Sequence, residues 1–123
     1  MQTTRQRILV IDDDPDIGVM MKMMLEYKGY DALVSERADD AMQTLSTDKI
    51  DLIIMDMLLS GVNGVDVCTE LKKDAKTINI PIVMISAHPS AKSMCLDAGA
   101  DDFISKPFDM QEMLTRISRL LPN

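Results

Sequence analysis

The chain has 123 residues, a length typical of one domain and long enough to bury a core without disulfide bonds. Apolar residues make up 46% and charged residues 27% of it, which is typical of a globular protein and excludes a disordered one. The 20 acidic and 13 basic residues give a formal charge of -7. Because such a field repels phosphate backbones and anionic lipids, we expect this domain alone to bind neither nucleic acid nor a membrane.

Cysteine usage and the start of the chain indicate a cytoplasmic protein. Cys68 and Cys95 form no CxxC pair, so we expect reduced, partly buried thiols. Polar residues 1–7 lead into only four apolar residues, too few for a signal peptide, and no run approaches membrane-spanning length. The 12 methionines favour a methionine-packed core, with a methionine-rich binding surface as the alternative.

Three continuous apolar runs predict buried strands: Ile8–Ile11, Leu52–Met55 and Ile82–Ile85. A strand that is apolar on both sides is covered on both sides, which is typical of a parallel sheet. Two weaker candidates, Tyr30–Val34 and Phe103–Ile104, are expected nearer the edges of that sheet.

Helical periods separate these runs. Asp14 is the expected N-cap of the first helix, with Pro15 at its first position and Gly29 as its stop. The five apolar faces comprise Ile17, Met20, Met21, Met24 and Leu25; Ala38, Ala41, Met42 and Leu45; Val67, Cys68 and Leu71, starting near Gly64; Met94, Cys95 and Ala98, ending at Gly99; and Met110, Met113, Leu114, Ile117 and Leu121.

This order of five strand–helix repeats predicts one α/β domain over residues 1–123. Its parallel sheet carries helices on both faces and right-handed crossovers. Because the chain stops at Pro122 and Asn123, just after the fifth helix, we expect no output domain in it. Ligands in such sheets bind at the carboxyl ends of the strands, so polar residues there are the functional candidates.

Polar residues follow four of the predicted strands. They are Asp12, Asp13 and Asp14 after the first strand, Asp56 after the third, Ser86 after the fourth, and Lys106 with Pro107 after the fifth. Each has an ordinary alternative as a cap, turn residue or solvated side chain, and Asp14 is the one that we expect to be a helix cap. Their common position at one edge of the sheet is the functional signal.

The gathered carboxylates require a cation. Two carboxylates about 4 Å apart repel by roughly 4 kcal/mol at an effective dielectric of about 20. Lys106 offsets part of this repulsion, and Mg²⁺ suits the remainder because it takes few protein oxygens and keeps several waters. A carboxylate such as Asp56 can attack phosphorus, with Lys106 and Ser86 neutralising the phosphoryl oxygens and no general base needed.

These motifs resemble the receiver domains of two-component response regulators over essentially the whole chain. Residues 8–15 resemble the opening strand and acidic pair, and residues 52–56 followed by Gly64 resemble the phosphorylation strand and loop. Residues 85–87 resemble the hydroxyl-bearing strand, and residues 98–108 are the most specific match. The resemblance implies a flavodoxin-like, doubly wound fold with strand order 2-1-3-4-5.

The resemblance also implies a role for each site residue. Asp56 would accept a phosphoryl group, Lys106 would pair with it, and Ser86 would move to hydrogen-bond it. The implied metal site comprises Asp13, Asp56 and the backbone carbonyl of Leu58 as direct Mg²⁺ ligands, with Asp12 acting through a metal-bound water. The remaining implied features are a cis bond before Pro107 and Phe103 as an aromatic switch that turns inward.

The implied partners are a sensor histidine kinase or a histidine phosphotransfer protein, which donates the phosphoryl group from histidine. A downstream protein target would bind the surface of the fourth helix, fifth strand and fifth helix. The chain departs from the family at Ser60, often a proline, and at Phe103, often a tyrosine; the stretch from Ser86 to Gly99 is about two residues shorter. Leu58 and His88 would flank the phosphate, although an ordinary loop role for His88 is preferred.

Three alternatives to a phosphorylation switch remain open. One is an unphosphorylated scaffold with the receiver shape. Another is a phosphatase with an aspartyl nucleophile, whose common form needs a second acid where this chain has Leu58. The third is a flavin-binding protein, in which residues 12–14 would repel the phosphate. We expect a protein that catalyses its own phosphorylation and slow dephosphorylation but is not a turnover enzyme.

Overall fold

The structure is a computed structural model, and it describes residues 5–59 and 61–121. The main sheet has five parallel strands in the order β2-β1-β3-β6-β7. The strands are β1 (Arg7–Ile11), β2 (Asp31–Ser35), β3 (Leu52–Asp56), β6 (Ile82–Ser86) and β7 (Asp102–Ser105). Counted along the chain, this order is the expected 2-1-3-4-5, so the flavodoxin-like fold is confirmed.

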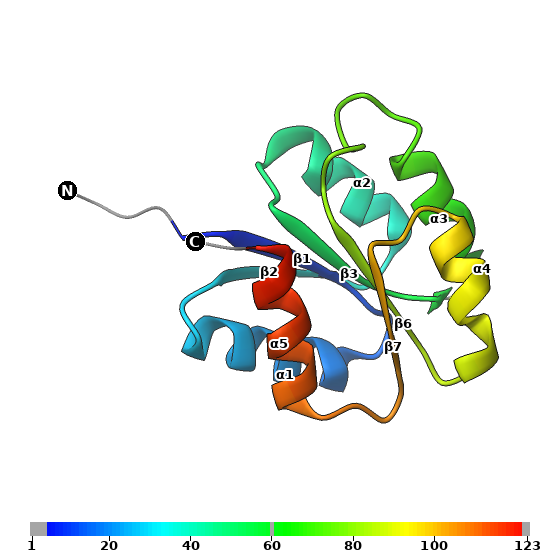
Figure 1. Cartoon of the computed structure of the whole chain (residues 1–123). Coiled ribbons are helices and arrows are strands. Elements are labelled where there is room, and N and C mark those ends of the chain that lie inside the picture. Colours follow the sequence, from blue (N-terminus) through cyan, green and yellow to red (C-terminus); the bar gives the residue numbers. More distant parts are fainter. Residues whose placement is uncertain (1–4, 60, 122–123) are drawn as a thin grey trace.

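Two layers of helices cover the sheet (Figure 1). One face carries α1 (Pro15–Tyr27) and α5 (Met110–Leu120), and the other carries α2 (Ala38–Thr47), α3 (Gly64–Leu71) and α4 (Lys92–Asp97). Alternate residues of β1 serve the two faces: Ile8 and Val10 pack on the α1–α5 side, and Leu9 and Ile11 on the other. This two-sided burial is why the central strands are continuous apolar runs. Among the described residues, no helix has both the length and the apolar character needed to cross a bilayer.

Three of the five helix faces were predicted too broadly, whereas Val67, Cys68 and Leu71 on α3 are buried as predicted. Met20, Met42 and Met94 were placed on buried stripes, but 42%, 39% and 51% of their surfaces are exposed. A helix that covers a flat sheet buries only a narrow strip, and the six-residue α4 buries Cys95 alone. Four other methionines, Met21, Met55, Met84 and Met113, are fully buried, so methionine serves both the core and the surface.

The two cysteines were predicted to be partly buried, and that prediction is wrong. Cys68 and Cys95 are free thiols with no exposed surface, because each lies on the side of its helix that faces the sheet. Burial raises the pKa of the Cys68 thiol to about 11, with a smaller opposing effect of Lys72. The Cys68 thiol is therefore neutral at physiological pH.

A small antiparallel hairpin follows β3 and was not predicted. It comprises β4 (Leu58–Leu59) and β5 (Val62–Asn63), which are too short to show a periodic pattern. The expectation for Ser60 lies outside the described residues, as do those for residues 1–4, 122 and 123. The hairpin leads directly into α3 and so connects the end of β3 with the first residue of a helix.

Candidate functional site

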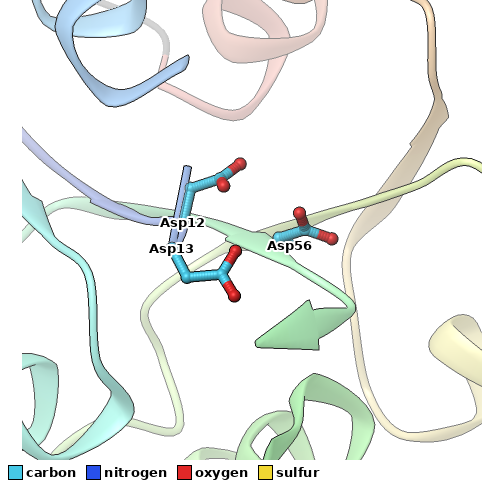
Figure 2. A group of neighbouring side chains, drawn as sticks. All are labelled: Asp12, Asp13 and Asp56. Atoms are coloured by element: carbon cyan, nitrogen blue, oxygen red, sulfur yellow. The ribbon is translucent and has the colours of Figure 1, made fainter. Parts of the chain in front are cut away.

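The carboxyl ends of β1 and β3 bring three carboxylates together. Asp12 and Asp13 directly follow β1, and Asp56 is the last residue of β3. Because these strands are neighbours in register, with Ile11 beside Met55, the three side chains extend from one edge of the sheet (Figure 2). One oxygen from each carboxylate lies within 4.8 Å of the others. The structure therefore gathers the three acids named from the sequence.

Lys106 lies among these carboxylates. Its Nζ is 2.8 Å from Oδ2 of Asp56 and 3.7 Å from Oδ2 of Asp12. Burial acts to lower the pKa of Lys106, but its hydrogen bond to Asp56 and the nearby charge of Asp12 outweigh that effect and raise the pKa. The Lys106–Pro107 peptide bond is cis, as the resemblance implied. Lys106 is therefore a charged partner for two of the acids, not a solvated surface lysine.

Asp12 is the most deeply buried of the three acids, with 1% of its surface exposed. Its Oδ1 accepts a hydrogen bond from the backbone N–H of Asp14 at 2.9 Å. Its Oδ2 is buried and accepts no hydrogen bond from residues 5–59 or 61–121. Burial raises the pKa of Asp12, and the charges of Asp56 and Asp13 add to the rise, whereas the Asp14 amide and Lys106 oppose it. The buried oxygen without a donor, in a set of carboxylates, fits a hard cation such as Mg²⁺.

The local chain fixes the direction of the Asp56 carboxylate. Only 9% of Asp56 is exposed, and its Oδ1 accepts a hydrogen bond from the Leu58 backbone N–H at 3.1 Å. The Leu58 side chain is 57% exposed and lies at the start of the hairpin. Asp14, by contrast, caps α1 by accepting a hydrogen bond from the Asp16 backbone N–H, with Pro15 next to it, as predicted.

Ser86 and Phe103 lie on the strands beyond Asp56. Ser86 is 2% exposed, and its hydroxyl oxygen accepts a hydrogen bond from the His88 backbone N–H at 3.0 Å. Phe103 is 5% exposed and packs in the cluster that contains Met84 and Cys95. Its ring is therefore already inside the core. His88 is exposed and precedes η1 (Pro89–Ala91), a 3-10 turn before α4, which agrees with a loop role.

Two features of this edge were not found from the sequence. The Lys106 backbone N–H donates to the Ser86 carbonyl at 2.8 Å, which joins the ends of β7 and β6 beside the acids. Gly64, expected only near the start of a helix and as part of the family resemblance, packs its backbone against Asp56 and Met57. A glycine at the start of a helix, just after the loop that follows Asp56, was the available signal for this close approach.

The chain is similar to several characterised regulators. It is 42% identical over 120 residues to the DNA-binding dual master transcriptional regulator RpaA of Synechocystis, covering 94% of this chain and 48% of that protein. It is 38% identical over 119 residues to the DNA-binding response regulator MtrA of Mycolicibacterium smegmatis, covering 95% of this chain and 51% of that protein. The chain thus spans about half the length of the curated relatives it matches.

Solved structures and a family model give the same result. The signal receiver domain of a signal transduction histidine kinase from Syntrophus aciditrophicus has a TM-score of 0.87 at 31% identity, covering 94% of this chain and 89% of that one. The Francisella response regulator 1452 receiver domain has a TM-score of 0.86 at 30% identity, covering 94% and 96%. The family model described as the response regulator receiver domain matches residues 8–118. With this match over most of its length, the chain belongs to the family of response regulator receiver domains of two-component signalling.

Proposed function

We propose that this receiver is a phosphorylation switch that accepts a phosphoryl group on Asp56 in a Mg²⁺-dependent reaction. The observation that carries the proposal is the group of three carboxylates with oxygens within 4.8 Å, together with the Lys106 ammonium 2.8 Å from Asp56. The donor would be a sensor histidine kinase or a histidine phosphotransfer protein in the cytoplasm.

The transfer forms one bond and breaks another. A carboxylate oxygen of Asp56 attacks phosphorus while the bond from phosphorus to the donor histidine nitrogen breaks, and its electron pair returns to the imidazole ring. Lys106 holds the transferred group through one of its oxygens, and the Ser86 hydroxyl donates to another. Asp13, Asp56 and the Leu58 carbonyl would hold Mg²⁺ directly and Asp12 through a water. When bound, the metal ion would neutralise part of the negative charge of the phosphoryl group.

The phosphoryl group would then bias a two-state equilibrium that a downstream protein reads on the α4–β7–α5 surface. Because the Phe103 ring is already buried, inward rotation of this ring is not needed for the change. We infer instead that movement of the Ser86 hydroxyl, which now accepts from the His88 amide, carries the signal towards η1 and α4. The ring keeps a packing role.

Intact-mass measurement tests the proposal directly. The protein is incubated with Mg²⁺ and a small phosphodonor such as acetyl phosphate, beside Asp56→Asn as the matched control. We expect a single phosphate adduct on the natural protein, none on Asp56→Asn, and none when EDTA removes the metal. Absence of an adduct on the natural protein with Mg²⁺ present would reject the phosphorylation switch.

The same samples separate the alternatives. An unphosphorylated scaffold would take no adduct and would show no response in a Mg²⁺ titration. A phosphatase would instead hydrolyse a phosphoester such as p-nitrophenyl phosphate through many rapid turnovers. The presence of Leu58 at the position of the usual second acid favours a long-lived adduct over such turnover.

A further inference from the structure

The position of Gly64, next to the backbone of Asp56, leaves no room for a side chain. Gly64 is the first residue of α3 and is buried. A Cβ atom added at this position would lie 2.6 Å from the Asp56 carbonyl oxygen and 2.9 Å from the Met57 carbonyl oxygen. Both neighbours are backbone atoms at the end of the central strand, so neither can move aside as a flexible side chain would. Only glycine permits this contact.

The contact closes a loop of chain that carries two of the proposed metal ligands. The Gly64 backbone N–H donates to the Met57 carbonyl at 2.6 Å. Leu58 pairs with Asn63 in the hairpin, and the Leu58 N–H donates to the Asp56 carboxylate at 3.1 Å. The Asp56 carboxylate and the Leu58 carbonyl are therefore both set by the path of residues 56–58, against which Gly64 packs.

We propose that Gly64 is a positioning residue for the phosphoryl-accepting site. By bringing the start of α3 against the backbone of Asp56 and Met57, it fixes the turn that directs the Asp56 carboxylate and the Leu58 carbonyl towards one metal ion. The inference rests on the proposed Mg²⁺-dependent function. It adds to that function a residue that contributes no ligand atom and no charge but determines metal affinity through main-chain geometry.

Gly18 provides a matched comparison within the same chain. It is also a buried helical glycine, and a Cβ atom there would lie 2.8 Å from Cγ1 of Val34. Val34 belongs to β2, an edge strand separated from β3 by β1. Gly18→Ala therefore introduces a steric conflict of comparable closeness, but with a side chain on an edge strand and without touching residues 56–58.

Mg²⁺ titration by isothermal calorimetry compares Gly64→Ala, Gly18→Ala and the natural protein, each checked for folding by circular dichroism and urea denaturation. We expect Gly64→Ala to bind Mg²⁺ about tenfold more weakly or worse, as when outer groups that orient a metal ligand are removed. Gly18→Ala should lose stability while its Mg²⁺ affinity stays within about twofold of the natural value. Excess Mg²⁺ should restore phosphorylation of Gly64→Ala, whereas a purely structural role would lower stability and leave the affinity unchanged.

Hydrogen exchange in the natural protein keeps the test independent of whether Gly64→Ala folds. Coupling is reciprocal, so if the Gly64 contact supports metal binding, Mg²⁺ must in turn stabilise the contact. Saturating Mg²⁺ should slow exchange of the Gly64 amide severalfold and leave the Gly29 amide, at the far end of α1, unchanged. An unaltered Gly64 amide, or unaltered affinity in Gly64→Ala, would overturn the inference. An adduct on the natural protein in the same preparation shows that the proposed function itself stands, and its absence shows that the function has failed.

Discussion

Acidic and basic side chains lie at both ends of the parallel strands, but they are paired differently at the amino-terminal and carboxyl-terminal ends. These two ends are called the amino-terminal and carboxyl-terminal edges of the sheet. At the amino-terminal edge, Arg7 lies 2.8 Å from Asp31 and 3.6 Å from Asp48. There Lys72 also lies 3.0 Å from Asp101 and donates to the Ile80 carbonyl at 2.8 Å. At the carboxyl-terminal edge, Asp12 and Asp56 share the ammonium of Lys106, and Asp13 lies beside them.

This difference separates charges that join segments of the fold from charges that the proposed phosphorylation would use. At the amino-terminal edge the basic side chains join neighbouring segments through ion pairs and carbonyl oxygens. At the other edge a buried Asp12 oxygen accepts no hydrogen bond within the described part of the chain, and burial raises the pKa of its carboxyl group. Burying a carboxylate whose oxygen lacks a donor destabilises the folded protein. A bound cation would relieve this destabilisation, so the same carboxylates favour binding of a cation and, with it, of a phosphoryl group.

The largest expected effect separates Lys106 from Lys72, the partly buried lysines at the two ends of the strands. Lys106→Met should slow phosphorylation by about 100-fold or more, because a preorganised donor to the transferred group is lost. Lys72→Met should leave the phosphorylation rate nearly unchanged and lower the free energy of unfolding by roughly 0.5–1.5 kcal/mol, because the partly buried Ile80 carbonyl oxygen loses its donor. Rates follow from time-resolved intact mass, and stabilities from urea denaturation. Equal losses of rate in both variants would contradict the distinction between the edges.

Metal binding should stabilise the carboxyl-terminal edge specifically. At about 100 times its dissociation constant, Mg²⁺ should raise the free energy of unfolding by about 2.7 kcal/mol, since only the folded protein holds the site. Asp13→Asn should lose most of this gain, whereas Arg7→Gln at the other edge should keep it. Thermal denaturation with and without Mg²⁺, at matched ionic strength, measures both. A gain that Asp13→Asn retains in full would show that the ion acts elsewhere.

The burial of Asp12 should also make the free energy of unfolding of the metal-free protein depend on pH. The pKa of Asp12 is raised above its ordinary value of 3.8 by burial, so the folded state holds this proton more tightly than the unfolded state. The resulting stability is complete below that ordinary value and is lost as the pH rises through the raised pKa. Asp12→Asn should flatten this fall, and Mg²⁺ should oppose it. Urea denaturation in EDTA at a series of pH values measures how steeply the free energy of unfolding falls with pH. This fall must be steeper in the natural protein than in Asp12→Asn.

The smallest expected effect belongs to the exposed ion pair at the amino-terminal edge. Both Arg7 and Asp31 side chains are 37% exposed, so solvent screens their attraction. Arg7→Gln should lower the free energy of unfolding by less than about 1 kcal/mol and leave the phosphorylation rate unchanged. Raising the salt concentration should narrow the gap between Arg7→Gln and the natural protein. If Arg7→Gln lowered the free energy of unfolding by several kcal/mol, the ion pairs at the amino-terminal edge would be as important as those at the carboxyl-terminal edge.

Much of the fold followed from local pattern. The runs at Leu52–Met55 and Ile82–Ile85 predicted strands because burial on both faces requires continuous apolar residues. Asp14 and Pro15 predicted the start of α1 because capping depends on adjacent residues alone. The breadth of three of the five buried helix faces was overestimated, as at Met94, because exposure depends on how much of a helix its neighbours cover.

The candidate site divides in the same way. Which residues lie at strand ends is a matter of sequence order, so the sequence alone predicts the candidates Asp12, Asp13, Asp56, Ser86 and Lys106. The sequence did not predict three features of the site: the direction of the Asp56 carboxylate, the inward position of Phe103 and the contact of Gly64. Each of these depends on atoms that are distant along the chain or on the path of a two-residue strand, for which no periodic signal exists.

The parallel α/β architecture and the identity of the acids at the carboxyl ends of the strands follow from the amino-acid sequence, because hydrophobic periodicity and the order of elements can be read along the chain. Only the packed chain leaves a buried Asp12 oxygen without a hydrogen bond from residues 5–59 or 61–121. It also sets Lys106 between two carboxylates and Gly64 against the end of β3. These outcomes depend on distances of a few ångströms between residues up to 94 positions apart, such as Asp12 and Lys106, and only the packed chain sets them.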